Sequence, residues 1–163
     1  MFLFLARHAW AGHFGDAGWT DDSLRELTPE GIDRYRRVVR CLAERGFAPG
    51  RVATSSYARC RQTAEIIAEE TLAAPVVEEL AALAPGADLH ALLDWSAASP
   101  GQDLCWVGHN PDVEWLTGAL IGDRGAGVRF AKGAIAAVRF DAAIAPGAGQ
   151  LYWHATAKSL GID

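Results

Sequence analysis

The feature that most constrains the fold of this chain is a pair of apolar segments, each followed closely by a histidine. Residues 2–5 (FLFL) are followed by Arg7 and His8, and residues 103–108 (DLCWVG) are followed by His109. Short apolar runs of this kind are typical of strands buried inside a sheet. Charged side chains are costly there, so we expect them at the strand ends, where open α/β sheets bind their ligands. The sequence therefore predicts an anion site at one edge of a parallel sheet.

The rest of the chain alternates between the periodicities of strands and helices. The first helix lies between Thr28, its expected N-cap, and Gly46. The other expected helices are 59–72, 88–98 and 111–122, and the expected strands are 2–7, 51–56, 75–80, 103–108, 134–140 and 149–155. The order βαβαβαβαββ predicts an α/β fold with three αβα layers, a mostly parallel central sheet and one late antiparallel strand. We expect residues 1–163 to form a single domain, because this length allows one sizeable core.

Composition narrows the classes of partner. The net charge of −5 argues against nucleic acid or an anionic membrane as the main partner. No apolar stretch approaches the ~20 residues that span a bilayer, and the first apolar run is too short for a signal peptide. The three cysteines, Cys41, Cys60 and Cys105, form no pair with the spacing of a zinc site or a disulfide framework. We therefore expect a cytoplasmic protein without a metal or another cofactor.

A further arginine is expected to join the two histidines. The strand that begins at residue 51 ends at the same sheet edge and leads to Arg59. Arg7, His8, Arg59 and His109 would then converge, and the helix that opens at Pro111 would add backbone N–H groups. Two arginines and two histidines offer more donors than a carboxylate can accept, so the site suits phosphate.

Four motifs in this order give the chain a family resemblance. They are RHA at 7–9, DSLRELTPEG at 22–31, SSYARCRQTA at 55–64 and GHN at 108–110. The set resembles the signature of the histidine phosphatase superfamily, which has the phosphoglycerate-mutase-like fold. Within it, the short chain and the second motif are most similar to the SixA-like phosphohistidine phosphatases.

The resemblance implies a role for each matched side chain. His8 would be the nucleophile that attacks phosphorus and forms a phosphohistidine intermediate. Arg7, Arg59 and a protonated His109 would hold the phosphoryl oxygens and stabilise the charge of the transition state, and Asn110 would also contact the phosphate. The substrate would be phosphohistidine on a protein, hydrolysed without a metal, because protein side chains supply the positive charge.

The general acid is the part of the pattern that this sequence leaves open. Where a SixA-like chain can carry a catalytic glutamate, this chain has Ala82. Expulsion of imidazole from phosphohistidine needs an acid less than expulsion of an alkoxide does, because the conjugate acid of imidazole has a pKa of ~6.5. Asp22 can also pair with Arg25 instead. The candidates for the acid or for a substrate contact are Asp22, Arg25, Glu78, Glu79 and Asp88.

Two other functions remain open from the sequence. A phosphatase of the same fold could act on a small phosphomonoester instead of a phosphorylated protein. A non-catalytic phosphate-binding module would need the arginines but not a nucleophile, so the presence of both histidines argues against it.

Overall fold

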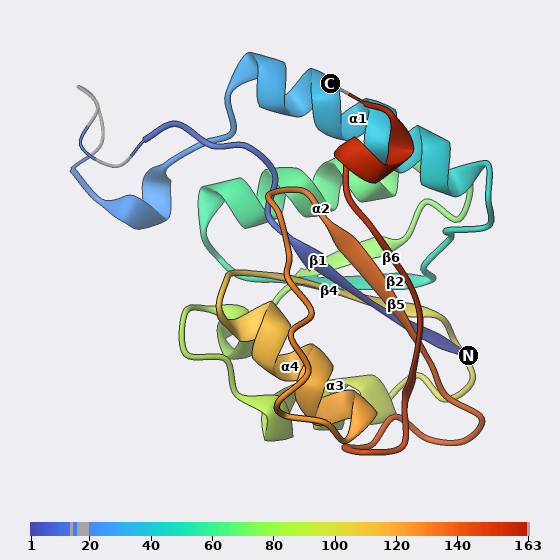
Figure 1. Cartoon of the computed structure of the whole chain (residues 1–163). Coiled ribbons are helices and arrows are strands. Elements are labelled where there is room, and N and C mark those ends of the chain that lie inside the picture. The colour runs from blue at the N-terminus through green and yellow to red at the C-terminus, as the bar shows by residue number, and fades with distance from the viewer. Residues whose placement is uncertain (14, 16–19, 163) are drawn as a thin grey trace.

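A six-stranded sheet forms the centre of the computed structural model, which describes residues 1–13, 15 and 20–162 (Figure 1). Its strands are β1 (Phe2–Arg7), β2 (Arg51–Thr54), β3 (Val76–Glu79), β4 (Leu104–Gly108), β5 (Ile135–Arg139) and β6 (Gln150–Ala155). The helices are α1 (Pro29–Ala43), α2 (Ala58–Glu70), α3 (Leu89–Ala97) and α4 (Asp112–Ile121). Helices α1 and α2 cover one face of the sheet and α3 and α4 cover the other, so the predicted three layers are confirmed.

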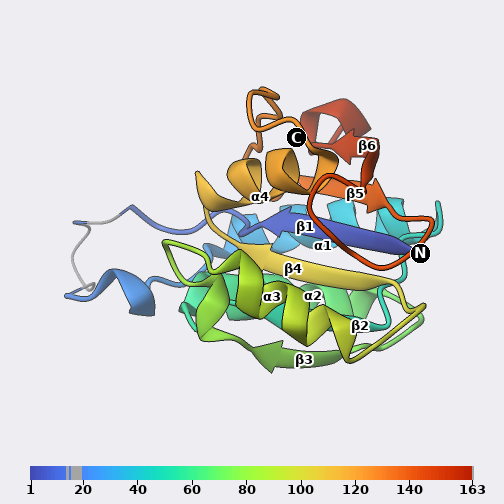
Figure 2. The same ribbon diagram turned by 90° about the horizontal axis from the view of Figure 1, so that it is seen from below.

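The strand order is β3-β2-β4-β1-β5-β6, which Figure 2 shows from below. The first four strands in this order are parallel, and β5 is antiparallel to both of its neighbours. The predicted mixed sheet with one late antiparallel strand is therefore confirmed. Since β5 runs against β1, the amino end of β5 lies beside the carboxyl ends of the parallel strands.

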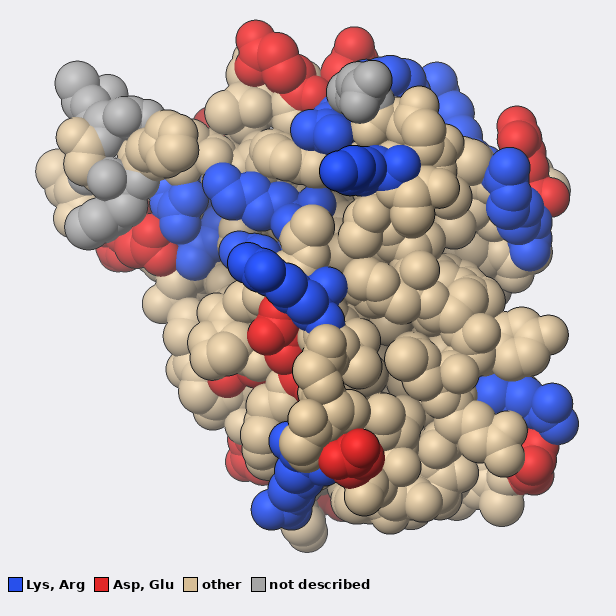
Figure 3. All heavy atoms as spheres, viewed as in Figure 1, with Lys and Arg blue, Asp and Glu red and all other residues tan. Residues whose placement is uncertain are grey.

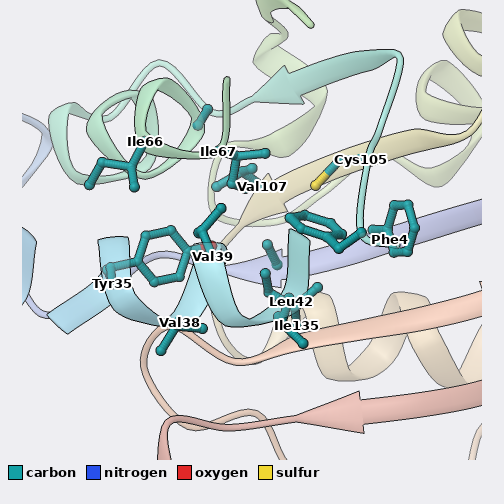
Figure 4. Close-up of a cluster of buried hydrophobic side chains, with 14 of the residues drawn as sticks. Phe4, Tyr35, Val38, Val39, Leu42, Ile66, Ile67, Cys105, Val107 and Ile135 are labelled. Carbon is teal, nitrogen blue, oxygen red and sulfur yellow. The ribbon is translucent and has the colours of Figure 1, made fainter. Parts of the chain in front are cut away.

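Alternating side chains of the central strands divide the core into two halves. Phe4 and Ala6 of β1 face α1 and α2, whereas Leu3 and Leu5 face α3 and α4. Figure 4 shows the first half, where Phe4 and residues of β4 and β5 pack against the two helices. Residues of β1 and β4 are buried on both faces, which explains why their sequences read as continuous apolar runs.

The predicted elements are all present, but several of their ends differ. The Thr28 hydroxyl caps α1 by accepting a hydrogen bond of 3.0 Å from the Gly31 N–H, as expected. Three short 3₁₀ helices were not predicted: η1 (Asp22–Leu24), η2 (Ala81–Leu83) and η3 (Lys158–Leu160). Such short helices carry too few residues for a periodic pattern. Among the described residues, no helix has the length and apolar character that crossing a membrane requires.

Candidate active site

The two predicted strand-end histidines lie side by side at one edge of the sheet. Strands β1 and β4 pair in parallel, with Arg7 opposite Gly108, so His8 and His109 are the next residues on adjacent strands. The His8 N–H donates to the Gly108 carbonyl at 3.0 Å. The two imidazole ring centroids are 5.5 Å apart. The parallel register thus brings together two residues that are far apart in the sequence.

The ring of His8 is held in one orientation. Its Nδ1 lies 2.8 Å from the Ala9 carbonyl oxygen, which can only accept, so Nδ1 carries the proton and Nε2 the lone pair. His8 is 6% exposed. Burial lowers the pKa of His8 to about 3, and the positive charges of Arg59 and Arg7 add to this effect. At neutral pH the side chain is therefore an uncharged imidazole with a free nitrogen.

Arg59, in the first turn of α2, links His109 to the segment that follows β1. Its guanidinium donates to the Asp22 carbonyl at 2.7 Å and to the Asp22 carboxylate at 2.9 Å. It also lies over the Tyr57 ring, 4.8 Å from the ring centroid. Nη2 of Arg59 is 3.3 Å from Nδ1 of His109. Only 4% of Arg59 is exposed, so its charge acts in a desolvated environment.

The tautomer of His109 follows from its neighbours. Because Arg59 can only donate, Nδ1 of His109 accepts, and Nε2–H then donates to the Ser55 hydroxyl at 2.9 Å. The Cys60 sulfur lies 3.4 Å from the same Nε2. Burial and then Arg59 lower the pKa of His109 to about 4. His109 is thus neutral in the free site, and the protonated form expected from the sequence requires an added negative charge.

Arg7, the last residue of β1, directly precedes His8. Its Nη1 donates to the Phe130 carbonyl at 2.8 Å. Burial lowers the pKa of Arg7, and the carboxylate of Glu114 acts in the opposite direction. The Nε atoms of Arg7 and Arg59 are both buried and have no hydrogen-bond partner. Buried donors without partners are rare in proteins, so both guanidinium groups retain hydrogen-bonding capacity that the protein itself does not use.

Two of the expected phosphate donors are engaged elsewhere. The Asn110 amide group donates to Glu114 at 2.6 Å and to the Phe130 carbonyl at 3.1 Å, so it has no free N–H for an anion. The first turn of α4 was also expected to offer backbone N–H groups, but the helix begins at Asp112. The Val113 N–H donates to the His109 carbonyl, and the next two N–H groups donate to the Pro111 carbonyl. Asn110 instead fixes the segment that holds Arg7.

Asp22 is the candidate carboxylate that lies at the site. One of its oxygens accepts from Arg25 and the other from Arg59, both at 2.9 Å. Burial alone would raise the pKa of Asp22, but the hydrogen bonds from Arg25 and Arg59 outweigh it and lower the pKa. The group is therefore an ionised acceptor in the free site rather than a ready proton donor. Arg25 also donates to the Gly12 carbonyl at 2.6 Å, which fixes its position.

The other candidate carboxylates have partners outside the four convergent side chains. Glu79 pairs with Arg61 at 3.4 Å, and both are about half exposed. Glu78 pairs with Arg51 at 2.6 Å. The Asp88 carboxylate accepts from the first N–H groups of α3 and caps that helix. The position of each of these three carboxylates is accounted for by the partner named here.

Ala82, where a related chain can carry the acid, lies in η2 beside the end of β4. A Cβ placed on Gly108 would lie 3.6 Å from a Leu83 methyl group. The turn therefore approaches the site, but residue 82 brings no carboxylate to it.

Three supporting residues were not singled out by the sequence reasoning. Thr63 accepts from the Ala9 N–H at 3.0 Å and donates to the Arg59 carbonyl at 2.6 Å, so it ties α2 to the residue after His8. Ser55 fixes the His109 tautomer. Glu114 accepts from the Phe130 N–H at 2.9 Å. Thr63 and Ser55 lie inside the SSYARCRQTA motif, which was a usable signal, whereas Glu114 lies outside all four motifs.

Comparisons with known proteins identify relatives of this chain. The sequence profile of the histidine phosphatase superfamily (branch 1) matches residues 3–86. An uncharacterized protein of Picosynechococcus sp. is 35% identical over 147 residues, covering 88% of this chain and 87% of its own length. A solved structure of the protein histidine phosphatase SixA complexed with tungstate is 27% identical, with a TM-score of 0.84, covering 98% of this chain and 99% of its own. Phosphoserine phosphatase from Entamoeba histolytica, complexed with 3-phosphoglyceric acid, shares the fold at 17% identity, with a TM-score of 0.69 and 98% coverage of both chains.

Proposed function

This chain belongs to the histidine phosphatase superfamily, and we propose that it is a phosphatase that hydrolyses phosphohistidine on a protein partner. One observation carries the proposal. The Nδ1–H of His8 donates to a backbone carbonyl, which leaves the lone pair on Nε2, and the ring lies beside His109 within the field of Arg59 and Arg7. The similarity to SixA supports the same substrate class.

In the first step, the Nε2 lone pair of His8 attacks phosphorus and forms a P–N bond. The P–N bond of the substrate breaks, and its electron pair stays on the departing imidazole, which takes a proton from solvent. The positive charges of Arg7 and Arg59 stabilise the phosphoryl oxygens, and the burial of Arg59 strengthens its effect. The Ala9 carbonyl stabilises the positive charge that develops on the His8 ring by accepting its Nδ1–H.

In the second step, water attacks the phosphorus of the phosphohistidine intermediate. The bond to Nε2 breaks, its electron pair returns to His8, and the protons of the water pass to phosphate and solvent. The ring keeps its Nδ1–H throughout, so the free enzyme is regenerated in the tautomer from which it started. Charge stabilisation by the same cations serves both steps, because both transfer a phosphoryl group through the same point.

The surroundings of the leaving group favour phosphohistidine over an alkyl phosphate. Residue 82 is an alanine, and Asp22 is ionised by its two arginine partners. An alkoxide leaving group needs a positioned acid, which is worth roughly 10²–10⁴ in rate. Imidazole needs one much less, because its conjugate acid has a pKa of ~6.5. We therefore infer that phosphohistidine is hydrolysed much faster than a sugar phosphate.

The test compares a phosphohistidine peptide with a sugar phosphate and includes a trapping experiment. Quenching in alkaline denaturant, in which the P–N bond is stable, during turnover of ³²P-labelled phosphohistidine should place the label on His8, and the His8→Ala variant should lose both label and turnover. Label on another residue would exclude His8 as the nucleophile. Faster hydrolysis of the sugar phosphate would assign the protein to small phosphomonoesters instead.

A further inference from the structure

A basic groove lies beside the proposed catalytic residues but includes none of them. It has a volume of about 310 Å³ and is formed by α1, the segment before β5 and the segment around η3. The groove is lined by Trp10, Arg34, Ala131, Lys132, Thr156, Ala157 and Lys158. We call these seven residues the basic groove. None of the steps proposed above uses it.

The charge of the basic groove is unusual for this chain. Three of its seven residues are cationic and none is acidic, although the whole chain has a net charge of −5. Lys132 and Lys158 are the two lysines of the entire sequence, and both line this groove. Among the described residues, neither lysine forms a salt bridge. Figure 3 shows Lys and Arg side chains gathered on this face, between the end of β1 and η3.

The floor of the basic groove is rigidly built. The Arg34 guanidinium lies over the Trp10 ring, 4.3 Å from its centroid, and donates to the Ile162 carbonyl. Gly133 has a φ of +70°, and a Cβ there would lie 2.9 Å from the Trp10 ring. A Cβ on Gly31 would collide with the Trp10 carbonyl oxygen. Because neither glycine has a side chain, Trp10 can pack closely against both, and Arg34 lies over its ring.

One wall of the basic groove is also a wall of the candidate active site. The Phe130 carbonyl accepts from Arg7, and the Gly133 N–H donates to the His8 carbonyl at 3.0 Å. Lys132 lies between these two contacts. Burial lowers the pKa of Lys132, and the positive charges of Arg7 and Arg25 act in the same direction. Positive charge therefore extends from the phosphate position into the groove.

We propose that the basic groove binds an acidic segment of the phosphorylated protein whose phosphohistidine enters the site. This proposal rests on the proposed function and specifies how the partner is recognised. The groove is open and its cations come from three elements, which suits several carboxylates spaced along a chain. Lysine ammonium groups donate to carboxylates in many orientations, as a flexible segment requires. Exposed charges of this kind contribute mainly to the rate of encounter and to partner choice.

The test uses two phosphohistidine peptides that differ only in charge. One carries four Asp or Glu residues beside the phosphohistidine, and the other carries Asn or Gln at the same positions. The wild type should hydrolyse the acidic peptide with about tenfold higher kcat/KM at low salt, and added salt should reduce this preference. Lys158→Glu should lower the preference about fivefold. Lys158 is exposed, so this variant should fold, and far-UV circular dichroism checks it.

Arg139→Glu is the matched control. It makes the same change of charge on an exposed residue at the far end of β5 and should leave the preference as in the wild type. Equal rates on the two peptides, or an equal loss of preference in both variants, would overturn the proposal.

A direct binding measurement separates this proposal from the proposed function. The unphosphorylated acidic peptide, labelled for fluorescence anisotropy, should bind wild type about fivefold more tightly than Lys158→Glu. If neither phosphohistidine peptide is hydrolysed but this difference holds, the proposed substrate is wrong and the groove is supported. If hydrolysis occurs without any such difference, the docking proposal is wrong and the proposed function is supported.

Discussion

Binding of a dianion should make His109 take up a proton. In the free site the pKa of His109 is about 4, because the ring is buried and Arg59 lies 3.3 Å from its Nδ1. An oxyanion held by Arg7 and Arg59 would place negative charge against this nitrogen and favour its protonation. The imidazolium would then donate through Nδ1–H to the anion, while Nε2–H continues to donate to the Ser55 hydroxyl. We therefore expect anion binding at neutral pH to be coupled to proton uptake.

The size of the effect follows from Coulomb's law. One unit charge about 4 Å away, at an effective dielectric constant of about 20, is worth about 4 kcal/mol. At 1.36 kcal/mol per unit, this raises a pKa by about 3 units, from about 4 to about 7. At pH 6 the uptake should then be about 0.9 proton per anion. The bound state holds more protons, so affinity must fall as pH rises, by roughly 50-fold between pH 5 and pH 7.

Isothermal titration calorimetry with sulfate measures this directly. Sulfate stays dianionic over this range, whereas phosphate itself titrates. Titrations at pH 6 in two buffers with different enthalpies of ionisation give the number of protons taken up. His109→Gln should reduce the uptake close to zero. His154→Gln is the matched control, because burial also lowers the pKa of His154 but it lies on β6, outside the candidate site.

Two results would refute the assignment. Binding without proton uptake at pH 6 would mean that His109 stays neutral in the complex. Undiminished uptake in His109→Gln would place the proton on another group, for which His8 is the nearest alternative, since its ring centroid is 5.5 Å from that of His109.

Three further predictions concern the supports of the site. Ser55→Ala leaves the buried His109 Nε2–H without its acceptor and should lower kcat/KM about tenfold with phosphohistidine, measured by phosphate release. In the folded protein the pKa of His8 is about 3 and that of His109 is about 4, both below the ordinary 6.5, so the unfolded state binds more protons in acid. The free energy of unfolding, measured with urea, should therefore be about 2 kcal/mol lower per histidine at pH 5 than at pH 7.5. Gly133→Ala, at a φ of +70° and against the Trp10 ring, should lower the free energy of unfolding by about 1–3 kcal/mol, seen as a lower Tm.

The strands that position the site could be predicted from the sequence, because each of them has a local sequence pattern. Apolar runs that fill a sheet interior identify β1 and β4, and their parallel direction places the residues after them at one edge. His8 and His109 therefore meet, as predicted. Thr28 and Gly31 fix the start of α1 by a contact between near neighbours, which the sequence also contains.

The details that control chemistry depend on contacts between distant segments. The Asn110 side chain turns to Phe130 and Glu114, and no pattern around a GHN motif predicts that choice. The neutral state of His109 results from its burial and from Arg59, 50 residues away in the chain. The basic groove joins Trp10, Lys132 and Lys158, whose approach depends on how β5 and β6 are added to the sheet.

The direction of β5 separates two kinds of loop at the site edge. Segments that leave the parallel strands carry the side chains proposed to react with phosphorus, whereas the segment that enters β5 carries Phe130 and Lys132. This incoming segment meets the reacting residues through the Phe130 carbonyl and the Gly133 N–H, which are backbone groups that most sequences can supply. Its exposed and half-exposed side chains can therefore change, by natural drift or by grafting in the laboratory, while the chemistry stays intact. Libraries randomised at residues 126–129, 131 and 132, with the buried Phe130 kept, are thus the natural starting point for redirecting this scaffold to new phosphorylated partners.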